Sequence, residues 1–234
     1  MAIEPGMPSD TPAMRTLRLA HRGDWRSATE NSLAALIAGT QAARSDGLEF
    51  DVHLSADGTP VVIHDSSLRR VQGVDGPVAG IETAVLARYG VPTLADVLAA
   101  LPPTVFLDVE LKVTPNATVA RLLEAARGPQ PADVVVSSYL PDALVAVTRR
   151  LPRWPRWLNS DWLDAGVVER ARSLGCRGIA AQWRSISPYS ARIVREAGLE
   201  LAAFTVRREA TVQRLERLGV RVVCVEGRPL DRAP

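Results

Sequence analysis

The stretch that decides the fold runs from Leu48 to Asp65 and reads LEFDVHLSADGTPVVIHD. Its first half alternates polar and apolar residues, and residues two apart on an extended strand share a face. One face therefore carries the polar side chains of Glu49, Asp51 and His53. The Asp57-Gly58 dipeptide favours a tight turn, so a second short strand is expected to return from it and to deliver His64. Carboxylates and histidines at strand ends suit metal binding and proton transfer.

Outward from this hairpin, short apolar runs alternate with helical segments as far as the C-terminus. The expected strands lie at residues 17–20, 48–54, 105–112, 134–138, 157–158, 178–182, 201–206 and 220–225. Such alternation predicts a parallel sheet, and eight units favour a closed (β/α)8 or TIM barrel, an α/β fold that typically needs about 250 residues. The alternative is an open doubly wound sheet. That fold usually brings a glycine-rich phosphate loop after its first strand, and the HRGDW segment here is not one.

The rest of the chain is assigned around this barrel. Residues 73–90 contain four glycines and are predicted to form a small loop insertion after the hairpin of the second strand. A helix is expected at residues 30–43. Residues 1–15 are rich in proline and small residues and are expected to be a mobile leader. Residues 16–234 are expected to form a single catalytic barrel domain.

Composition excludes several classes of function. The 28 basic and 26 acidic residues nearly balance, so no overall positive field indicates a nucleic-acid partner. No apolar run approaches the ~20 residues of a membrane span. The N-terminal residues have neither the basic nor the apolar region of a secretion signal, so a cytoplasmic protein is expected. Cys176 and Cys224 both lie in apolar surroundings and are expected to be buried free thiols.

Three of the expected strands end in unusual sets of polar residues. Besides the set on the second strand, His21 and Arg22 follow the first, and Asp108, Glu110 and Lys112 share a face of the third. In barrels of this kind, catalytic groups gather at the C-terminal ends of the strands. We therefore expect these side chains to meet in one site.

The carboxylates of this site need a compensating charge, because burying each one costs several kcal/mol unless it is paired or binds metal. One explanation is that Glu49, Asp51 and Glu110 coordinate a single cation. Oxygen ligands suit Ca²⁺ or Mg²⁺ rather than zinc. The alternative is a set of structural ion pairs that joins Glu110 to Lys112 and Glu49 to Arg22.

Four nearby polar residues have simpler interpretations. His53 is expected to lie outside the site, and Asp65 to order the turn after His64 rather than to bind metal. Asp108 lies deeper in the barrel than Glu110 and is expected to form a buried ion pair. Asn31 is as compatible with capping the first helix as with contacting a metal ligand.

Five separated motifs, in the same order and at similar spacing, resemble those of the glycerophosphodiester phosphodiesterase family. They are AHRG at 20–23, ENS at 30–32, EFDV at 49–52, DGTPVVIHD at 57–65 and VELK at 109–112. Two later segments, SSY at 137–139 and FTV at 204–206, are similar to further family blocks, the second of which usually begins with tryptophan. The resemblance covers approximately residues 17–230.

The resemblance implies a (β/α)8 barrel that hydrolyses glycerophosphodiesters, small molecules of lipid and glycerol metabolism, to glycerol 3-phosphate and an alcohol. It also implies one divalent cation, Ca²⁺ or Mg²⁺. The residues that match the family motifs would take these roles: His21 and His64 as general acid and base, Glu49, Asp51 and Glu110 as metal ligands, Arg22 and Lys112 as phosphate contacts, and Phe204 as a contact for glycerol at the rim. The nucleophile is either water or the neighbouring glycerol hydroxyl, through a cyclic phosphate.

Two departures from the family pattern bear on the rim and on the leaving-group preference. The family usually has Thr-Asp near the last strand, where this chain has VEG at 225–227, and the insertion after His64 is short, which leaves the site open. Two other functions are considered beside the first. One is a lysophospholipase D or sphingomyelinase D type phosphodiesterase on the same scaffold. The other is a non-catalytic barrel that binds phosphate esters, although a decayed site would be expected to have lost at least one of its histidines or carboxylates.

Overall fold

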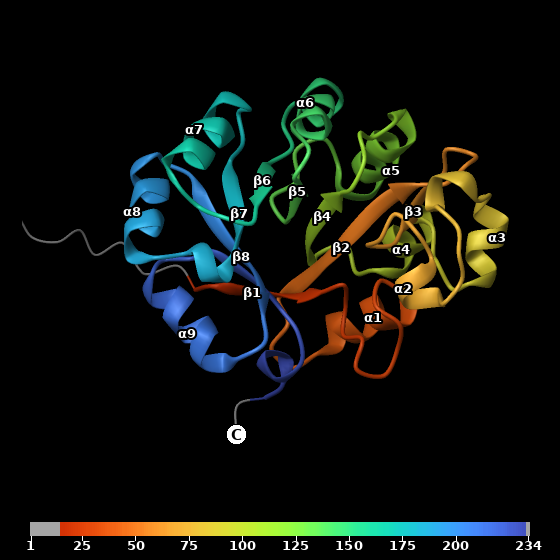
Figure 1. Cartoon of the computed structure of the whole chain (residues 1–234), viewed down its shortest axis with the longest axis horizontal. Coiled ribbons are helices and arrows are strands. Elements are labelled where there is room, and N and C mark those ends of the chain that lie inside the picture. The colour runs from red at the N-terminus through yellow and green to blue at the C-terminus, as the bar shows by residue number, and fades with distance from the viewer. Residues whose placement is uncertain (1–14, 233–234) are drawn as a thin grey trace, which may run out of the picture.

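The computed structural model describes residues 15–232, so almost all of the expected leader at 1–15 lies outside the described residues. Eight parallel strands form the ring β1-β9-β8-β7-β6-β5-β4-β2, and pairing of β1 with β2 closes it. Their bounds are β1 Leu17–His21, β2 Gly47–Leu54, β4 Phe106–Leu111, β5 Val134–Ser138, β6 Arg156–Ser160, β7 Gly178–Gln182, β8 Glu200–Val206 and β9 Val222–Val225. Helices surround the ring (Figure 1). The fold is the predicted (β/α)8 barrel.

The helices follow the strands along the chain. The long ones are α1 Leu33–Gln41, α4 Leu94–Ala100, α5 Ala117–Arg127, α6 Pro141–Arg150, α7 Ala165–Ser173, α8 Pro188–Glu196 and α9 Glu209–Arg217. Two short 3₁₀ helices, η2 Trp183–Ser185 and η3 Arg228–Leu230, follow β7 and β9. Helix α1 begins later than residue 30 because Ser32 is its N-cap and accepts a hydrogen bond from the backbone of Ala35.

The insertion after β2 differs in part from the prediction. Strand β3 (Pro60–Val62) pairs antiparallel with β2, as expected, and Gly58 at the turn has a positive φ of 74°. Residues 73–90 are not a plain loop, however, because they form η1 Val78–Gly80 and α3 Thr83–Arg88, and α2 Arg69–Gln72 directly precedes them. These pieces surround a small core of their own: Val61, Ile63, Leu68, Val78, Leu86 and Val91. Burial of these apolar side chains outweighs the local preference of the glycines for loops.

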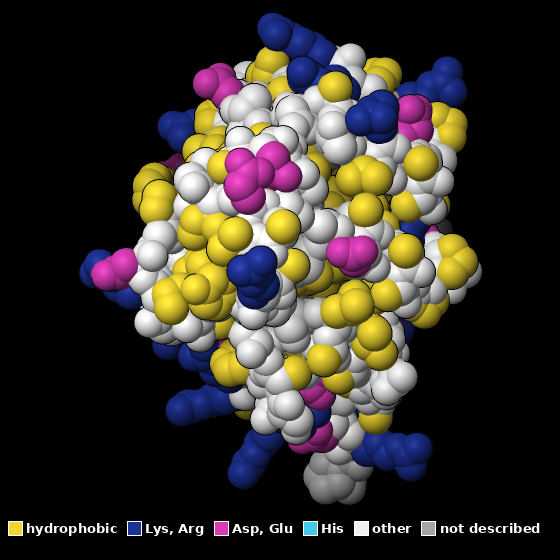
Figure 2. Space-filling view, turned by 90° about the vertical axis from the view of Figure 1, so that its right-hand side faces the viewer, with side chains coloured by type: hydrophobic (Ala, Val, Ile, Leu, Met, Phe, Trp, Pro, Cys, Tyr) yellow, Lys and Arg dark blue, Asp and Glu magenta, His cyan; other side chains and the backbone are white. Residues whose placement is uncertain are grey.

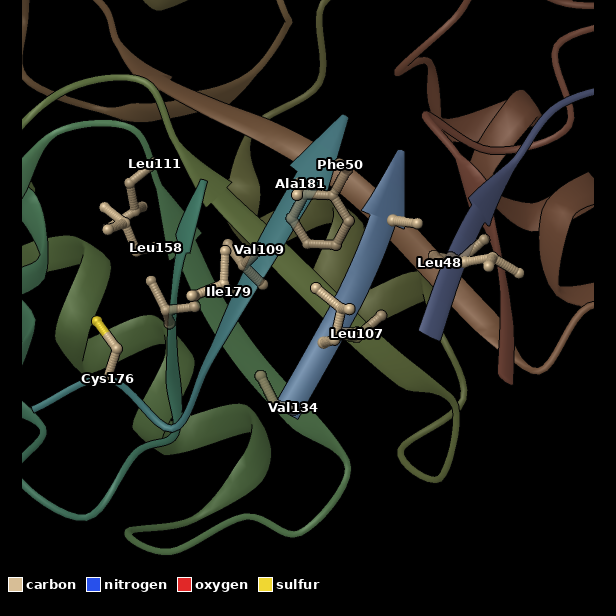
Figure 3. Close-up of a cluster of buried hydrophobic side chains, with 14 of the residues drawn as sticks. Leu48, Phe50, Leu107, Val109, Leu111, Val134, Leu158, Cys176, Ile179 and Ala181 are labelled. Carbon is tan, nitrogen blue, oxygen red and sulfur yellow. The ribbon is translucent and has the colours of Figure 1, made fainter. Parts of the chain in front are cut away.

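The barrel wall sorts its side chains by strict alternation. Leu48 and Phe50 of β2 point away from the barrel axis and join the large hydrophobic cluster that contains residues of α1 and α4 (Figure 3). The residues between them, Glu49 and Asp51, therefore point inward. Inside the barrel, a second cluster around Trp157 fills the interior. The polar residues at the C-terminal ends of the strands consequently have an apolar layer behind them.

Two further expectations can be compared with the structure. Cys176 and Cys224 are buried free thiols, as predicted. Across residues 15–232, no helix has the length and apolar character that a membrane crossing requires. Figure 2 shows the face on the α3 side, where separate basic and acidic side chains stand among hydrophobic ones. That face carries no large patch of charges of one sign.

Close contact between strands makes one glycine of the barrel hard to replace. A Cβ atom at Gly178 of β7 would lie 2.6 Å from the backbone oxygen of Glu200 and 2.8 Å from the ring of Trp157. We expect Gly178→Ala to lower the free energy of unfolding by about 1–3 kcal/mol, measured by urea denaturation. Gly166→Ala, on the exposed first turn of α7, is the matched control: its Cβ would meet only the Asp164 side chain, at 3.2 Å, and alanine favours helix, so it should cost much less. Equal stability of the two variants would contradict this packing.

Candidate active site

A cavity of about 370 Å³ opens at the C-terminal ends of the strands, the end where barrel enzymes carry their sites. All but one of the sequence-predicted site residues line it: His21, Arg22, Glu49, His64, Glu110, Lys112 and Phe204. The remaining one, Asp51, is fully buried and lies next to the cavity, with Oδ1 3.1 Å from Nζ of Lys112. The structure thus brings the predicted residues together.

The three predicted metal ligands form a compact cluster. One carboxylate oxygen from each of Glu49, Asp51 and Glu110 lies within 4.8 Å of the others. Burial, and then the charges of Asp51 and Glu110, raise the pKa of Glu49 well above its ordinary value. Burial and the charge of Asp51 likewise raise the pKa of Glu110 to about 7. Three acids this close therefore favour an added positive charge.

Unused acceptors in the cluster fit a hard cation. Glu49 Oε1 is buried and receives no hydrogen bond from any residue that the structure describes. The same holds for Asp51 Oδ1, although the Lys112 ammonium is near it. Buried acceptors without donors are costly, and oxygen ligands are those that Ca²⁺ and Mg²⁺ prefer. The residues present therefore fit a divalent cation.

Lys112 follows β4 and lies between two of the acids. Its Nζ donates to Glu110 Oε1 over 2.5 Å and lies 3.1 Å from Asp51 Oδ1. Burial alone would raise the pKa of Asp51, but the charges of Lys112 and Arg22 lower it to about 2. The structure therefore contains the ion pair between Glu110 and Lys112 that the alternative interpretation required. It also contains the cluster of three carboxylates that could hold a cation.

Arg22 does not form the ion pair with Glu49 that this alternative required. Its backbone N–H donates to Glu49 Oε2 over 3.0 Å, while its guanidinium donates to Glu30 over 2.8 Å. Its Nε lies 3.4 Å from Asp51 Oδ2. The chain bends sharply here, with Arg22 at a positive φ of 59°, and this turn aims the side chain toward the acids.

His21, at the end of β1, is held by a residue whose role the sequence did not reveal. Its Nδ1 lies 2.7 Å from Oε1 of Glu226, which directly follows β9, and its Nε2 lies 3.7 Å from Glu49 Oε2. Arg207 donates to the other oxygen of Glu226 over 2.6 Å. Burial raises the pKa of Glu226, but hydrogen bonds from His21 and Arg207 hold it below its usual value. The sequence feature that could have indicated this role is the position of Glu226 at the end of β9, the strand that pairs with β1.

His64, which lines the same cavity, also has a carboxylate partner. Its Nδ1 lies 2.6 Å from Oδ1 of Asp65, so Asp65 orients the imidazole as well as the turn. Arg70 of α2 donates to Asp65 over 2.6 Å and to Glu30 over 2.5 Å. Burial lowers the pKa of His64, which favours the neutral imidazole. The insertion thus holds the loop that carries His64.

The remaining polar candidates divide clearly. Asn31 donates to Asp51 Oδ2 over 2.8 Å, so it contacts a predicted metal ligand, and the capping role belongs to its neighbour. His53 contacts the backbone of His64 and does not line the cavity. The ion pair expected for Asp108 was wrong: among residues 15–232 it pairs with no cation, and burial raises its pKa to about 7. Lys112 pairs instead with Asp51 and Glu110, which lie nearer the C-terminal ends of their strands than Asp108 does.

Comparison with known proteins agrees with this geometry. The chain matches the glycerophosphoryl diester phosphodiesterase family over residues 21–226. It is 28% identical to a glycerophosphodiester phosphodiesterase of Caldanaerobacter subterraneus subsp. tengcongensis, over 88% of this chain and 92% of that protein. A solved phosphodiesterase of Oleispira antarctica, in complex with the product sn-glycerol-3-phosphate, superposes with a TM-score of 0.77 at 27% identity, covering 89% of this chain and 92% of that one. A Galdieria sulphuraria structure at 16% identity shares the fold, with a TM-score of 0.81 over 92% of this chain and 95% of that one.

The barrel, its cavity and these matches together define a phosphoric diester hydrolase. The chain belongs to the glycerophosphoryl diester phosphodiesterase family.

The unused carboxylate oxygens predict stabilisation by a cation. Ca²⁺ or Mg²⁺ is added to the EDTA-treated protein at a concentration about 100 times the dissociation constant of the ion. This addition should raise the Tm of the protein by about 5–10 °C. Glu49→Gln should remove most of this shift, measured by calorimetry, because it replaces a charged ligand. Glu169→Gln, an exposed acid of α7, is the control and should keep it. A full shift in Glu49→Gln would contradict the assignment.

Proposed function

We propose that this protein hydrolyses glycerophosphodiesters to glycerol 3-phosphate and an alcohol, with a divalent cation and two histidines. The observation that carries the proposal is the convergence of His21, His64 and a cluster of buried carboxylates at one cavity. The activity in the names of its relatives and the product bound to the Oleispira antarctica enzyme support it.

Glu49, Asp51 and Glu110 would hold the cation, and their oxygen-only set favours Ca²⁺ or Mg²⁺. When bound, the cation supplies a positive charge that polarises the phosphoryl group and stabilises the transition state. Asn31 donates to Asp51 Oδ2 and so fixes the orientation of one of these acids. Such support around a metal ligand keeps its oxygens aimed at the ion.

Two cationic side chains would bind the phosphate group. Arg22 Nε is buried and, within the described part of the chain, donates no hydrogen bond, so a phosphate oxygen can accept one. Lys112 lines the same cavity and carries its charge beside the acids. Negative charge grows on the oxygens of the diester as it reacts, and fixed cations already in place lower the energy of that state.

The histidines would move the protons. Each has Nδ1 against a carboxylate, Glu226 for His21 and Asp65 for His64. Nε2 is left for proton transfer, and that of His21 lies 3.5 Å from the hydroxyl of Thr205 in the cavity wall. One imidazole takes the proton of the nucleophile, and the other donates a proton to the leaving oxygen. The carboxylates fix the ring orientations and stabilise the charged imidazolium, as the acid does in a catalytic triad.

Phe204 would contact the glycerol moiety at the rim. Its ring meets that of Tyr139 edge to face, with centroids 6.1 Å apart, and both line the cavity. The two rings form an apolar wall against which the carbon skeleton of glycerol can lie.

A lysophospholipase D activity is the second candidate, and one feature favours it. A second cavity of about 370 Å³, lined by Trp25 among others, adjoins the first through Arg207 and offers apolar surface for an acyl chain. Faster turnover of lysophosphatidylcholine than of glycerophosphocholine would establish this activity in place of the first.

The two histidines can be tested directly. His21→Asn and His64→Asn should each lower kcat by about 10²–10⁴-fold, measured as glycerol 3-phosphate released from glycerophosphoglycerol, and EDTA should abolish release by the wild-type protein. Retention of the cation-dependent rise in Tm in each variant is the folding control. Wild-type activity in the double variant would overturn the proton-transfer roles.

The carboxylate behind His21 gives a further prediction. Glu226→Gln removes an ionic hydrogen bond worth about 1.5–3 kcal/mol, so kcat/KM should fall by about 10–100-fold. Glu226→Asp, which keeps the carboxylate, should retain more of the rate than Glu226→Gln. Glu216→Gln, an exposed acid of α9, should leave the rate unchanged. An equal loss of rate in Glu226→Asp and Glu226→Gln would contradict a role for the negative charge beside His21.

A further inference from the structure

We propose that Arg184, supported by Trp183, forms a subsite for an anionic group on the leaving alcohol. The enzyme would therefore prefer diesters whose alcohol carries a phosphate or carboxylate over those that carry a quaternary ammonium. This inference rests on the proposed function and specifies the substrate class of the same cavity.

The subsite lies across the barrel mouth from the carboxylate cluster. In the closed ring, β7 stands four places from β2 in either direction, through β1, β9 and β8 or through β4, β5 and β6 (Figure 1). Arg184 belongs to η2, which directly follows β7, and it lines the cavity. Phe204, the proposed glycerol contact, is the register partner of Gln182 on β7, so a diester whose phosphate lies at Arg22 and Lys112 would bring its alcohol to Arg184 beside the glycerol.

Hydrogen bonds from α9 hold the segment 183–186, which carries Arg184. Arg214 donates to the backbone oxygens of Trp183 and Ile186, each over 3.0 Å. The backbone N–H of Arg184 donates to the side chain of Gln182 over 2.7 Å. Its guanidinium lies 4.4 Å from the centroid of the Trp183 ring. Because the guanidinium rests on a fixed aromatic surface, less conformational entropy is lost when it binds a ligand.

The charge at this side of the cavity is uncompensated. Within residues 15–232, Arg184 belongs to no ion pair, whereas the two other arginines of the lining, Arg22 and Arg207, pair with Glu30 and Glu226. The carboxylates that line the cavity are Glu49, Asp108 and Glu110, which lie on β2 and β4. The mouth on the β7 side therefore offers the positive charge of Arg184, and Asp161, which directly follows the neighbouring β6, accepts a hydrogen bond from Tyr139 and does not pair with Arg184.

A quaternary ammonium group would find this side unfavourable. Proteins bind such groups over aromatic faces. The Trp183 ring already has two guanidinium groups close to it, Arg184 at 4.4 Å and Arg214 at 5.7 Å from its centroid. A third cation would meet repulsion, whereas a phosphate or carboxylate can accept two parallel hydrogen bonds from Arg184.

A matched pair of substrates tests the subsite. Glycerophosphoinositol 4-phosphate differs from glycerophosphoinositol by one phosphate on the alcohol, and glycerophosphocholine carries the cation. With the metal-loaded wild-type enzyme at low salt, kcat/KM for the phosphorylated substrate should exceed that for its parent by about 3–10-fold, with glycerophosphocholine slowest. This ratio should shrink in about 0.5 M NaCl because salt screens exposed charges.

Two variants and a control locate the effect. Arg184→Gln should bring the ratio of the two inositol substrates close to one, and Arg184→Glu should bring it below one. Arg192→Gln, on the exposed surface of α8, should keep the wild-type ratio.

The outcomes separate the two proposals. Turnover of these diesters with a ratio that does not depend on Arg184, or with glycerophosphocholine preferred, would overturn the subsite and leave the proposed function intact. Turnover of none of the three would overturn both.

Discussion

The constraint on which the structure depends is the burial of like charges within the barrel wall. Strand β2 turns Leu48 and Phe50 outward to the helices, and the same alternation turns Glu49 and Asp51 inward, beside Glu110 of the neighbouring strand. Carboxylates in this position cannot all ionise without compensation. The surrounding residues supply part of it through Arg22, Lys112 and the amide of Asn31. The donor-free oxygens that remain are suited to a divalent cation, and the charge-handling chemistry of a phosphodiesterase follows.

Much of the fold could be predicted because its signals are local. The alternation from Leu48 to Leu54 and the turn at Asp57-Gly58 specify the hairpin, and regular strand–helix repetition specifies the barrel. The short helices of the insertion were not predicted. Segments as short as α3 gain their stability from contacts such as that of Leu86 with Val61 and Val78, and those contacts are not visible in the residues nearest in sequence.

The site was predictable to the extent that each residue stands at a strand end. The partners of the histidines were harder to predict, because Glu226 is separated from His21 by 205 residues and is brought near only by closure of the barrel. Asp108 shows the opposite error. It was expected to form a buried ion pair because it lies deep in the barrel, yet the Lys112 ammonium pairs with Asp51 and Glu110 instead.

The pairing of β1 with β9 also bears on how the site is assembled. His21 and the carboxylate that orients it are 205 residues apart in the chain, and they meet because β9 pairs with β1. A barrel in which these two strands have not yet paired would therefore contain His21 without its orienting partner.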